Sequence, residues 1–177
     1  ELENLIGLDS QSNAKQNLGS SVGKNYDPSF NWERLQQIRD QWPRKLIIKG
    51  ILNPEDAKRL VQMGCDAIVV SNHGGRQLDR APIPFHLIPD VRKALGKKTE
   101  IHVDTGIMHG ADVIAAIALG ANFTWIGRAY LYGLMAGGKE GVDRSLEILR
   151  TQMVRTMKLL GARSLAELKP EHVKHLI

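Results

Sequence analysis

One unit recurs along the chain and limits the folds that it can adopt. Four short apolar runs, KLIIKG, AIVV, EIHVD and FTWIG, are each followed by a helical pattern. Apolar strands without a polar face that alternate with helices are typical of a parallel sheet covered by helices. The sequence therefore predicts an α/β fold of about four βα units.

The helical patterns carry start and stop signals. In NPEDAKRLVQMG, Asn53 is a suitable cap, Pro54 takes the first helical position and Gly64 marks the stop. The segment NWERLQQIRDQW predicts a helix behind Asn31. Further helices are predicted near His86–Leu95, over GADVIAAIALG, and over Val142–Leu160.

Four units are half of the eight that close a (β/α)8 barrel of ~250 residues. The turn after the first run, KGILNP, lacks the glycine-rich fingerprint of a dinucleotide-binding sheet. We therefore expect residues 31–177 to form the C-terminal half of a (β/α)8 TIM barrel, with the remaining strands upstream. Residues 1–30, rich in Asn, Ser, Gly and Gln, are expected to form a long loop.

Composition narrows the classes of protein. The 177 residues are 42% hydrophobic, which excludes a disordered chain, and the net charge of +5 is spread along the sequence. A solvated surface is therefore favoured over nucleic-acid binding. The single cysteine, Cys65, cannot form an internal disulfide, so we expect it to be buried in a protein of a reducing, cytoplasmic compartment. No run approaches the ~20 apolar residues of a membrane span.

Polar residues stand where the four apolar runs end. They are Lys49, Ser71 with His73, Asp104, and Gly127 with Arg128. In parallel folds, ligands bind at the carboxyl ends of the strands, where loops and helix N-termini converge. This placement favours a ligand site over a solvated turn for the stretch SNHGGRQLD.

Two residues of that stretch suggest a reaction. A neutral histidine such as His73 accepts a proton near neutral pH, and the guanidinium of Arg76 binds a carboxylate through two parallel hydrogen bonds. Together they suit proton abstraction from an acid that carries a hydroxyl at its second carbon. A structural role for His73, and a salt bridge from Arg76 to Asp79, are the alternatives.

The other strand ends suit a cofactor. Lys49 could stabilise negative charge on a cofactor ring, although simple exposure at a strand end is the alternative. The DTG and IGR segments, at the ends of two late strands, are typical of a phosphate site, and Asp104 suits hydroxyl groups. His172 and His175 have no companions at metal-ligand spacing, so no metal site is predicted.

The motif SNHGGRQLD, together with KG, DTG and IGRAYLYGLMAGGKEGV, resembles the FMN-dependent 2-hydroxy-acid dehydrogenases and oxidases. The resemblance covers essentially the whole chain, as the C-terminal half of that fold. The segments NLGSSVG, WPRKLIIKG and DTGIMHGADVIAAIALGA look most like respiratory L-lactate dehydrogenases.

The resemblance implies roles for named residues. His73 matches the active-site base, Arg76 the arginine that holds the substrate carboxylate, and Lys49 the lysine near the N1 and O2 edge of the flavin. Ser71 matches a flavin contact. The positions that match those around the ribityl chain and phosphate are Asp104, Gly106, Gly127 and Arg128.

The implied activity is oxidation of an L-2-hydroxy acid, L-lactate to pyruvate above all, with electrons passed to a quinone or another acceptor. In the family, a tyrosine and an aspartate that pairs with the catalytic histidine lie upstream, so this chain alone is expected to lack turnover. Residues 1–30 match a loop that is mobile or meets a membrane in some members, which suggests a peripheral position on the inner face. A homo-oligomer, such as a tetramer, is expected.

One position departs from the family pattern. Many members have an arginine for the phosphate where this chain has Met108, so Arg128, His109 or backbone N–H groups must suffice. Two alternatives stay open: another phosphate-binding FMN barrel, of the isomerase type, and a non-catalytic fragment that assembles with the N-terminal half.

Overall fold

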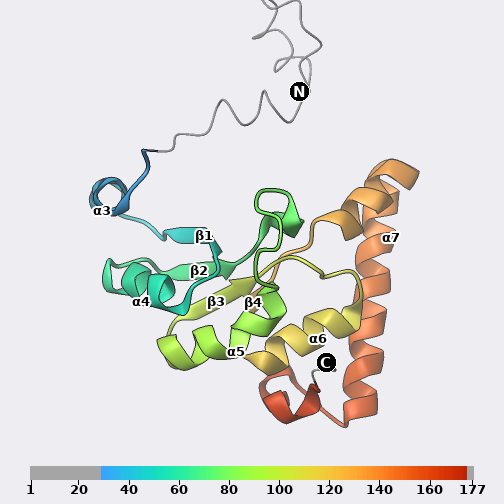
Figure 1. Cartoon of the computed structure of the whole chain (residues 1–177). Helices are drawn as coiled ribbons and strands as arrows, with labels where there is room; N and C mark the ends of the chain where they lie inside the picture. Colours follow the sequence, from blue (N-terminus) through green and yellow to red (C-terminus); the bar gives the residue numbers. More distant parts are fainter. Residues whose placement is uncertain (1–28, 175–177) are drawn as a thin grey trace, which may run out of the picture. The chain divides into compact units, whose positions relative to one another are not determined.

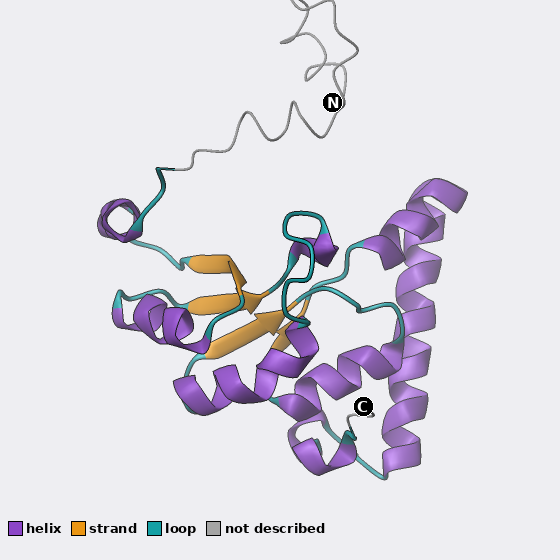
Figure 2. Cartoon of the chain, in the orientation of Figure 1, coloured by secondary structure: helices purple, strands orange, loops and turns teal. Residues whose placement is uncertain are grey.

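The structure, a computed structural model, describes residues 29–174. At its centre is a parallel sheet in the order β1-β2-β3-β4. The strands are β1 (Ile47–Ile51), β2 (Ala67–Val70), β3 (Glu100–Val103) and β4 (Phe123–Thr124). Consecutive strands are connected by helices α4 (Pro54–Gln62), α5 (Pro84–Leu95) and α6 (Gly110–Leu119), and α7 (Arg128–Leu160) follows β4 (Figure 1, Figure 2). Four βα units therefore follow one another, as the sequence predicts.

The chain divides into two compact units, residues 1–37 and 38–177, and the sheet belongs to the second. Helix α3 (Trp32–Gln41) starts in the first unit, where the amide of Arg34 donates to Oδ1 of Asn31 at 2.9 Å. The predicted cap is therefore confirmed. The predicted loop over residues 1–30 lies outside the described residues, apart from its last two.

The limits of the connecting helices follow local signals. The amide of Glu55 donates to Oδ1 of Asn53 at 2.9 Å at the start of α4, which confirms that cap. Helix α6 ends at Gly120, whose φ of 117° is costly for residues with a Cβ. Helix α5 begins at Pro84, two residues before the predicted start, because proline fits the first turn of a helix.

Helices α4, α5 and α6 lie together on one face of the sheet (Figure 1). Side chains alternate along a strand, so Ile68 and Val70 share a face, as do Ile101 and Val103 of the paired strand. All four are fully buried, as are helix residues such as Ile88. Each such side chain stabilises the fold by roughly 1.5–3 kcal/mol, so this layer is the core. Separately, Cys65 is buried as expected, and burial raises the pKa of its thiol.

The opposite face is less covered. Lys49, Val69, His102 and Phe123 stand in register across the four strands and share this face. At the edges, Ile47 is 41% exposed and Phe123 is 58% exposed. The prediction that the strands have no wet face is therefore wrong for β1 and β4, because each is an edge strand with a single neighbour.

Two elements differ from their predicted limits. Strand β1 continues past Lys49 to Ile51, with an irregular register that coincides with the positive φ of Gly50, 94°. Helix α7 extends well before the predicted start at Val142, but non-helical angles at Gly137 and Gly138 divide it. Short 3₁₀ turns at Leu165–Glu167 and Pro170–His172 follow it. Within residues 29–174, no helix is both long and apolar enough to cross a bilayer.

Candidate active site

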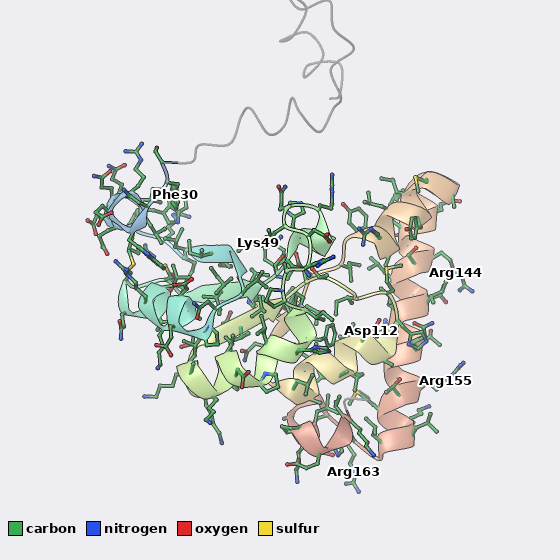
Figure 3. The ribbon with its side chains drawn as sticks, in the orientation of Figure 1. Phe30, Lys49, Asp112, Arg144, Arg155 and Arg163 are labelled. Carbon is green, nitrogen blue, oxygen red and sulfur yellow. The ribbon has the colours of Figure 1, made fainter. Side chains whose placement is uncertain are left out.

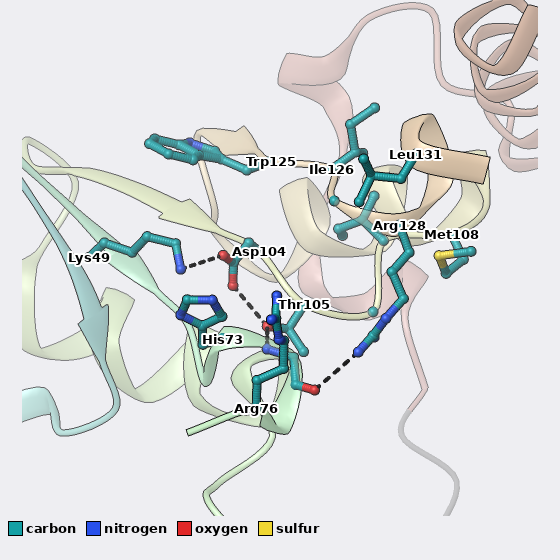
Figure 4. A pocket seen from close by; sticks show the side chains of 14 residues that line it. Lys49, His73, Arg76, Asp104, Thr105, Met108, Trp125, Ile126, Arg128 and Leu131 are labelled. Carbon is teal, nitrogen blue, oxygen red and sulfur yellow. Dashed lines mark hydrogen bonds and ion pairs between the residues drawn. The ribbon is translucent and has the colours of Figure 1, made fainter. Parts of the chain in front are cut away.

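A pocket of about 270 Å³ lies at the carboxyl ends of the strands (Figure 4). It is lined by Lys49, by the turn after β2, by the segment after β3 and by the start of α7. The predicted site residues that line it are Lys49, His73, Arg76, Asp104, Gly106, Gly127 and Arg128. Ser71 lies behind the wall and bonds to Lys49. The structure thus places seven of the eight predicted site residues around one pocket and the eighth, Ser71, in contact with Lys49, and their roles remain predictions.

Lys49 and Asp104 form an ion pair across two strand ends. Nζ of Lys49 lies 2.9 Å from Oδ2 of Asp104, and it donates a hydrogen bond to Oγ of Ser71 at 2.9 Å. Ser71 is 1% exposed, and its hydroxyl also accepts from the amide of His73 at 3.1 Å and donates to Asp104. This uses both lone pairs and the proton of the hydroxyl. Lys49 is therefore held in place by two partners, although its side chain is still 38% exposed.

The charge of Asp104 follows from these contacts. Burial alone would raise the pKa of Asp104, but hydrogen bonds from Ser71, Lys49 and Thr105, together with the positive charge of Lys49, lower it below its usual value. The carboxylate is therefore ionised at neutral pH and keeps unused lone pairs that could accept hydrogen bonds from hydroxyl groups.

The turn after β2 depends on left-handed backbone conformations. His73, Gly74 and Gly75 have φ values of 56°, 67° and 72° and form a single 3₁₀ turn, His73–Gly75. Oδ1 of Asn72 accepts from the amide of Gly75 at 3.2 Å. Two glycines enter this conformation without a Cβ penalty, which lets the turn direct His73 and Arg76 toward the pocket.

The side chains of His73 and Arg76 are exposed and hold no hydrogen bond or ion pair with any residue from 29 to 174. Asp79, the alternative partner of Arg76, instead accepts from the amide of Arg80 at 3.0 Å. The described residues therefore give no support to a structural role for either side chain. A base and a guanidinium with free hydrogen-bonding groups stand on one short turn.

The other end of the pocket suits an anion. Gly127 precedes α7 without a side-chain cap, so the first amides of that helix are left for another acceptor. Arg128 follows directly, and its Nη2 lies 3.4 Å from the carbonyl oxygen of Gly74. Other arginines labelled in Figure 3, Arg144 and Arg155, lie on α7 away from this pocket.

Met108 also lines the pocket and is 48% exposed. Some of the groups predicted to bind the phosphate in place of an arginine at this position already have hydrogen-bond partners in the neighbouring segment. Nδ1 of His109 accepts from the amide of Ala111 at 3.0 Å, and the amides of Met108 and His109 both donate to Oδ2 of Asp112. Arg128 and the start of α7 therefore remain for a phosphate, as does the Nε2–H group of His109, which these contacts leave unused.

The pocket residues to which sequence reasoning assigned no individual role include Thr105, within the DTG segment, and Trp125. Nε1 of Trp125 donates to Nδ1 of His102 at 3.1 Å, which puts the His102 proton on Nε2, 3.3 Å from Oε2 of Glu100. His102 is buried, with 8% of its surface exposed. Trp125 and His102 meet because they lie on the same face of the sheet, and this can be recognised only once the register of β3 and β4 is known. Among residues 29–174, no three His, Cys, Asp or Glu side chains cluster as metal ligands do.

Comparison with known proteins identifies the family. The model of a family described as FMN-dependent dehydrogenase matches residues 3–175. The chain belongs to the FMN-dependent dehydrogenase family. A putative L-lactate dehydrogenase of Mycobacterium tuberculosis is 60% identical over 90% of the chain, and (S)-mandelate dehydrogenase of Pseudomonas putida is 38% identical over 99%. The chain spans 38% and 44% of these two relatives.

A solved structure of an FMN-dependent dehydrogenase supports the same conclusion about the fold. The crystal structure of the monotopic membrane protein (S)-mandelate dehydrogenase has a TM-score of 0.83 and 39% identity, covering 89% of this chain and 42% of that one. The structural neighbours are TIM barrels, so the predicted partial (β/α)8 barrel is confirmed.

The cofactor of the family is FMN, and the residues of the pocket fit it. Arg128 and the uncapped start of α7 suit the phosphate, and the ionised Asp104 suits the hydroxyl groups of the ribityl chain. The ammonium of Lys49, fixed by Ser71 and Asp104, suits the polar edge of the flavin ring. Met108, which also lines the pocket, has no charge and does not contribute to the phosphate.

Proposed function

We propose that the chain is the C-terminal part of an FMN-dependent enzyme that oxidises an L-2-hydroxy acid, with L-lactate as its main substrate. The observation that carries the proposal is the pair of free side chains, His73 and Arg76, on one turn beside Lys49. The relative named putative L-lactate dehydrogenase, at 60% identity, favours lactate over mandelate.

The pocket residues divide the work of the reaction. A 2-hydroxy acid loses two electrons and two protons when it becomes a 2-oxo acid. Arg76 would bind the carboxylate through its planar fork and so fix the second carbon beside His73, whose imidazole would accept one proton. FMN, when bound, supplies the acceptor for the two electrons and for the second proton.

Lys49 would contribute electrostatically. Its ammonium would face negative charge that develops at the edge of the cofactor, and a fixed cation in a pocket stabilises such charge without reorganisation. Asp104 and Ser71 hold it there. Because its pKa is lowered, Asp104 is ionised at neutral pH and serves as the counter-ion of Lys49.

We further propose that the chain acts together with an N-terminal half-barrel. The chain spans less than half of its relatives, and the edge strands carry exposed Ile47 and Phe123 that such a half would cover. An upstream carboxylate would also supply the partner that His73 lacks among the described residues. We therefore expect no lactate oxidation by these 177 residues alone, and detectable turnover by the purified chain would contradict this.

The electron acceptor and the location follow from the same proposal. Electrons would pass to a quinone or another acceptor, and the enzyme would lie in the cytoplasm or peripherally at the inner face of the membrane. A solved relative named as a monotopic membrane protein supports the second location. A homo-oligomer such as a tetramer remains a prediction.

The test is an anaerobic visible spectrum of the protein carrying both halves, before and after L-lactate, D-lactate and (S)-mandelate. The oxidised flavin band should bleach with L-lactate, and more slowly with (S)-mandelate. A band that none of these acids bleaches would reject the activity and favour an FMN barrel of the isomerase type. Absence of any flavin band would favour a non-catalytic fragment.

A further inference from the structure

Thr105 adopts a backbone conformation that its side chain disfavours. Its φ is 74°, and the other non-glycine residues with positive φ in the described part of the chain are His73 and Arg80. A β-branched residue in this region is an outlier, and such outliers persist where surrounding contacts fix them. Two of these three residues, Thr105 and His73, line the same pocket.

The hydroxyl of Thr105 connects two separate segments (Figure 4). Oγ1 donates to Oδ1 of Asp104 at 2.8 Å and accepts from the amide of Gly74 at 3.2 Å, 31 residues away in sequence. The positive φ brings the side chain back toward the preceding residue. The strained conformation and the two contacts therefore belong to one arrangement.

Ser71, which precedes the turn in sequence, also connects the turn with Asp104. Its hydroxyl donates to Asp104 and accepts from the amide of His73 at 3.1 Å. Two consecutive amides of the turn, those of His73 and Gly74, are thus held by two hydroxyls that converge on a single carboxylate. The same carboxylate accepts from Thr105 at Oδ1 and pairs with Lys49 at Oδ2.

We propose that Thr105 is a positioning residue. Together with Ser71, it connects the His73–Arg76 turn to Asp104 by hydrogen bonds and so positions the base and the carboxylate-binding arginine relative to Lys49. The catalytic consequence rests on the proposed function, whereas the contact with the turn does not.

Three variants separate the hydroxyl from the backbone. Thr105→Ser keeps the hydroxyl, Thr105→Ala removes it and keeps a Cβ at positive φ, and Thr105→Gly removes both the hydroxyl and the strain. Each is made in the protein that carries both barrel halves. If the alanine variant does not fold but the glycine variant does, the effect of the hydroxyl is measured by comparing Thr105→Gly with Thr105→Ser.

The first readout needs no substrate. Hydrogen exchange at the Gly74 amide should accelerate about tenfold in Thr105→Ala and Thr105→Gly, which is about 1.4 kcal/mol of local protection, and stay unchanged in Thr105→Ser. Unchanged exchange in both hydroxyl-free variants would overturn the contact, and the proposal with it.

The second readout is flavin reduction at saturating L-lactate. The hydroxyl-free variants should be about tenfold slower and should bind FMN normally. Thr105→Ser should keep the rate of the unmodified protein, because it keeps the hydroxyl. Faster exchange at Gly74 with an unchanged rate would overturn the positioning role. If no 2-hydroxy acid reduces the unmodified protein, the proposed function fails, and the exchange data still decide the contact.

Discussion

Two aspartates, at opposite ends of the same sheet, hold lysines at nearly the same distance. Before β2, Asp66 accepts from Nζ of Lys45 at 2.7 Å and from the amide of Leu46 at 2.9 Å. After β3, Asp104 pairs with Nζ of Lys49 at 2.9 Å. By distance alone, neither pair could be told from the other as a functional site.

The surroundings of the two pairs differ. Beside Asp66, the guanidinium of Arg39 donates hydrogen bonds to that carboxylate and to the backbone carbonyls of Trp42, Arg44 and Gly64. Beside Asp104, His73 and Arg76 keep free groups, and the backbone around them is strained. Hydrogen-bonding side chains that lack a partner among the described residues, together with backbone strain, therefore distinguish the site better than an ion pair does.

The largest expected effect of a substitution is at His73. His73→Gln in the protein with both halves should slow lactate-dependent flavin reduction by ~10²–10⁴, the usual contribution of a general base. FMN should stay bound, because His73 supports neither end of the proposed cofactor site. Stopped-flow absorbance checks this, and reduction at the unmodified rate would remove His73 from the reaction.

Arg76 should come second. Arg76→Lys keeps the charge but loses the fork, so kcat/KM for lactate should fall by roughly 10–100-fold, as expected for one or two charge-assisted hydrogen bonds. Steady-state kinetics measure it, with Arg144→Lys as the control, since Arg144 pairs on the surface of α7 with Glu147. An equal effect of both substitutions would show that Arg76 does not bind the substrate.

Lys49→Met should have a smaller effect on rate, about tenfold, and a direct effect on Asp104. The pKa of Asp104 should rise toward its usual value, because the carboxylate loses a hydrogen bond and a neighbouring positive charge. Carboxyl chemical shifts followed from pH 2 to 7 by NMR measure this. If the pKa of Asp104 does not move, the ion pair is not what holds that carboxylate ionised.

The smallest effect on activity is expected at Asp66. Hydrogen bonds from Lys45 and from the amide of Leu46 lower the pKa of Asp66, so its stabilising contribution is present above the unfolded-state pKa and disappears as pH falls through the folded-state value. Asp66→Asn should therefore lower Tm at pH 7, with a difference that shrinks below about pH 4. Thermal melts at several pH values test this, and a change in flavin reduction would show that the two ends of the sheet are not separate in function.

The comparison also shows what the sequence could predict. The helix α4 follows from Asn53, Pro54 and Gly64, because caps and stops act within a few residues. The edge of the sheet that carries the site could be predicted from Ser71 and Asp104, which directly follow strands, because parallel strands end on the same side. The family motif supplied the roles proposed for His73 and Arg76.

Features that depend on register or on contacts between distant segments were missed. The pairing of Trp125 with His102 requires β3 and β4 to be aligned, and periodicity does not fix that alignment. The positive φ of Thr105 runs against its residue type, and only its contacts with Asp104 and Gly74 explain it. The exposure of β1 and β4 depends on which strands are neighbours.

Trp125 also makes the protein an optical reporter of its own cofactor. Its indole is anchored by His102 in the pocket wall, whereas Trp42 bonds to the carbonyl of Lys45, before β1 at the opposite end of the sheet. Oxidised flavin absorbs light where tryptophan emits, so energy transfer would dim Trp125 more than Trp42. Cofactor loading could then be followed from intrinsic emission, with Trp125→Phe as the variant in which the contribution of Trp125 to that quenching disappears.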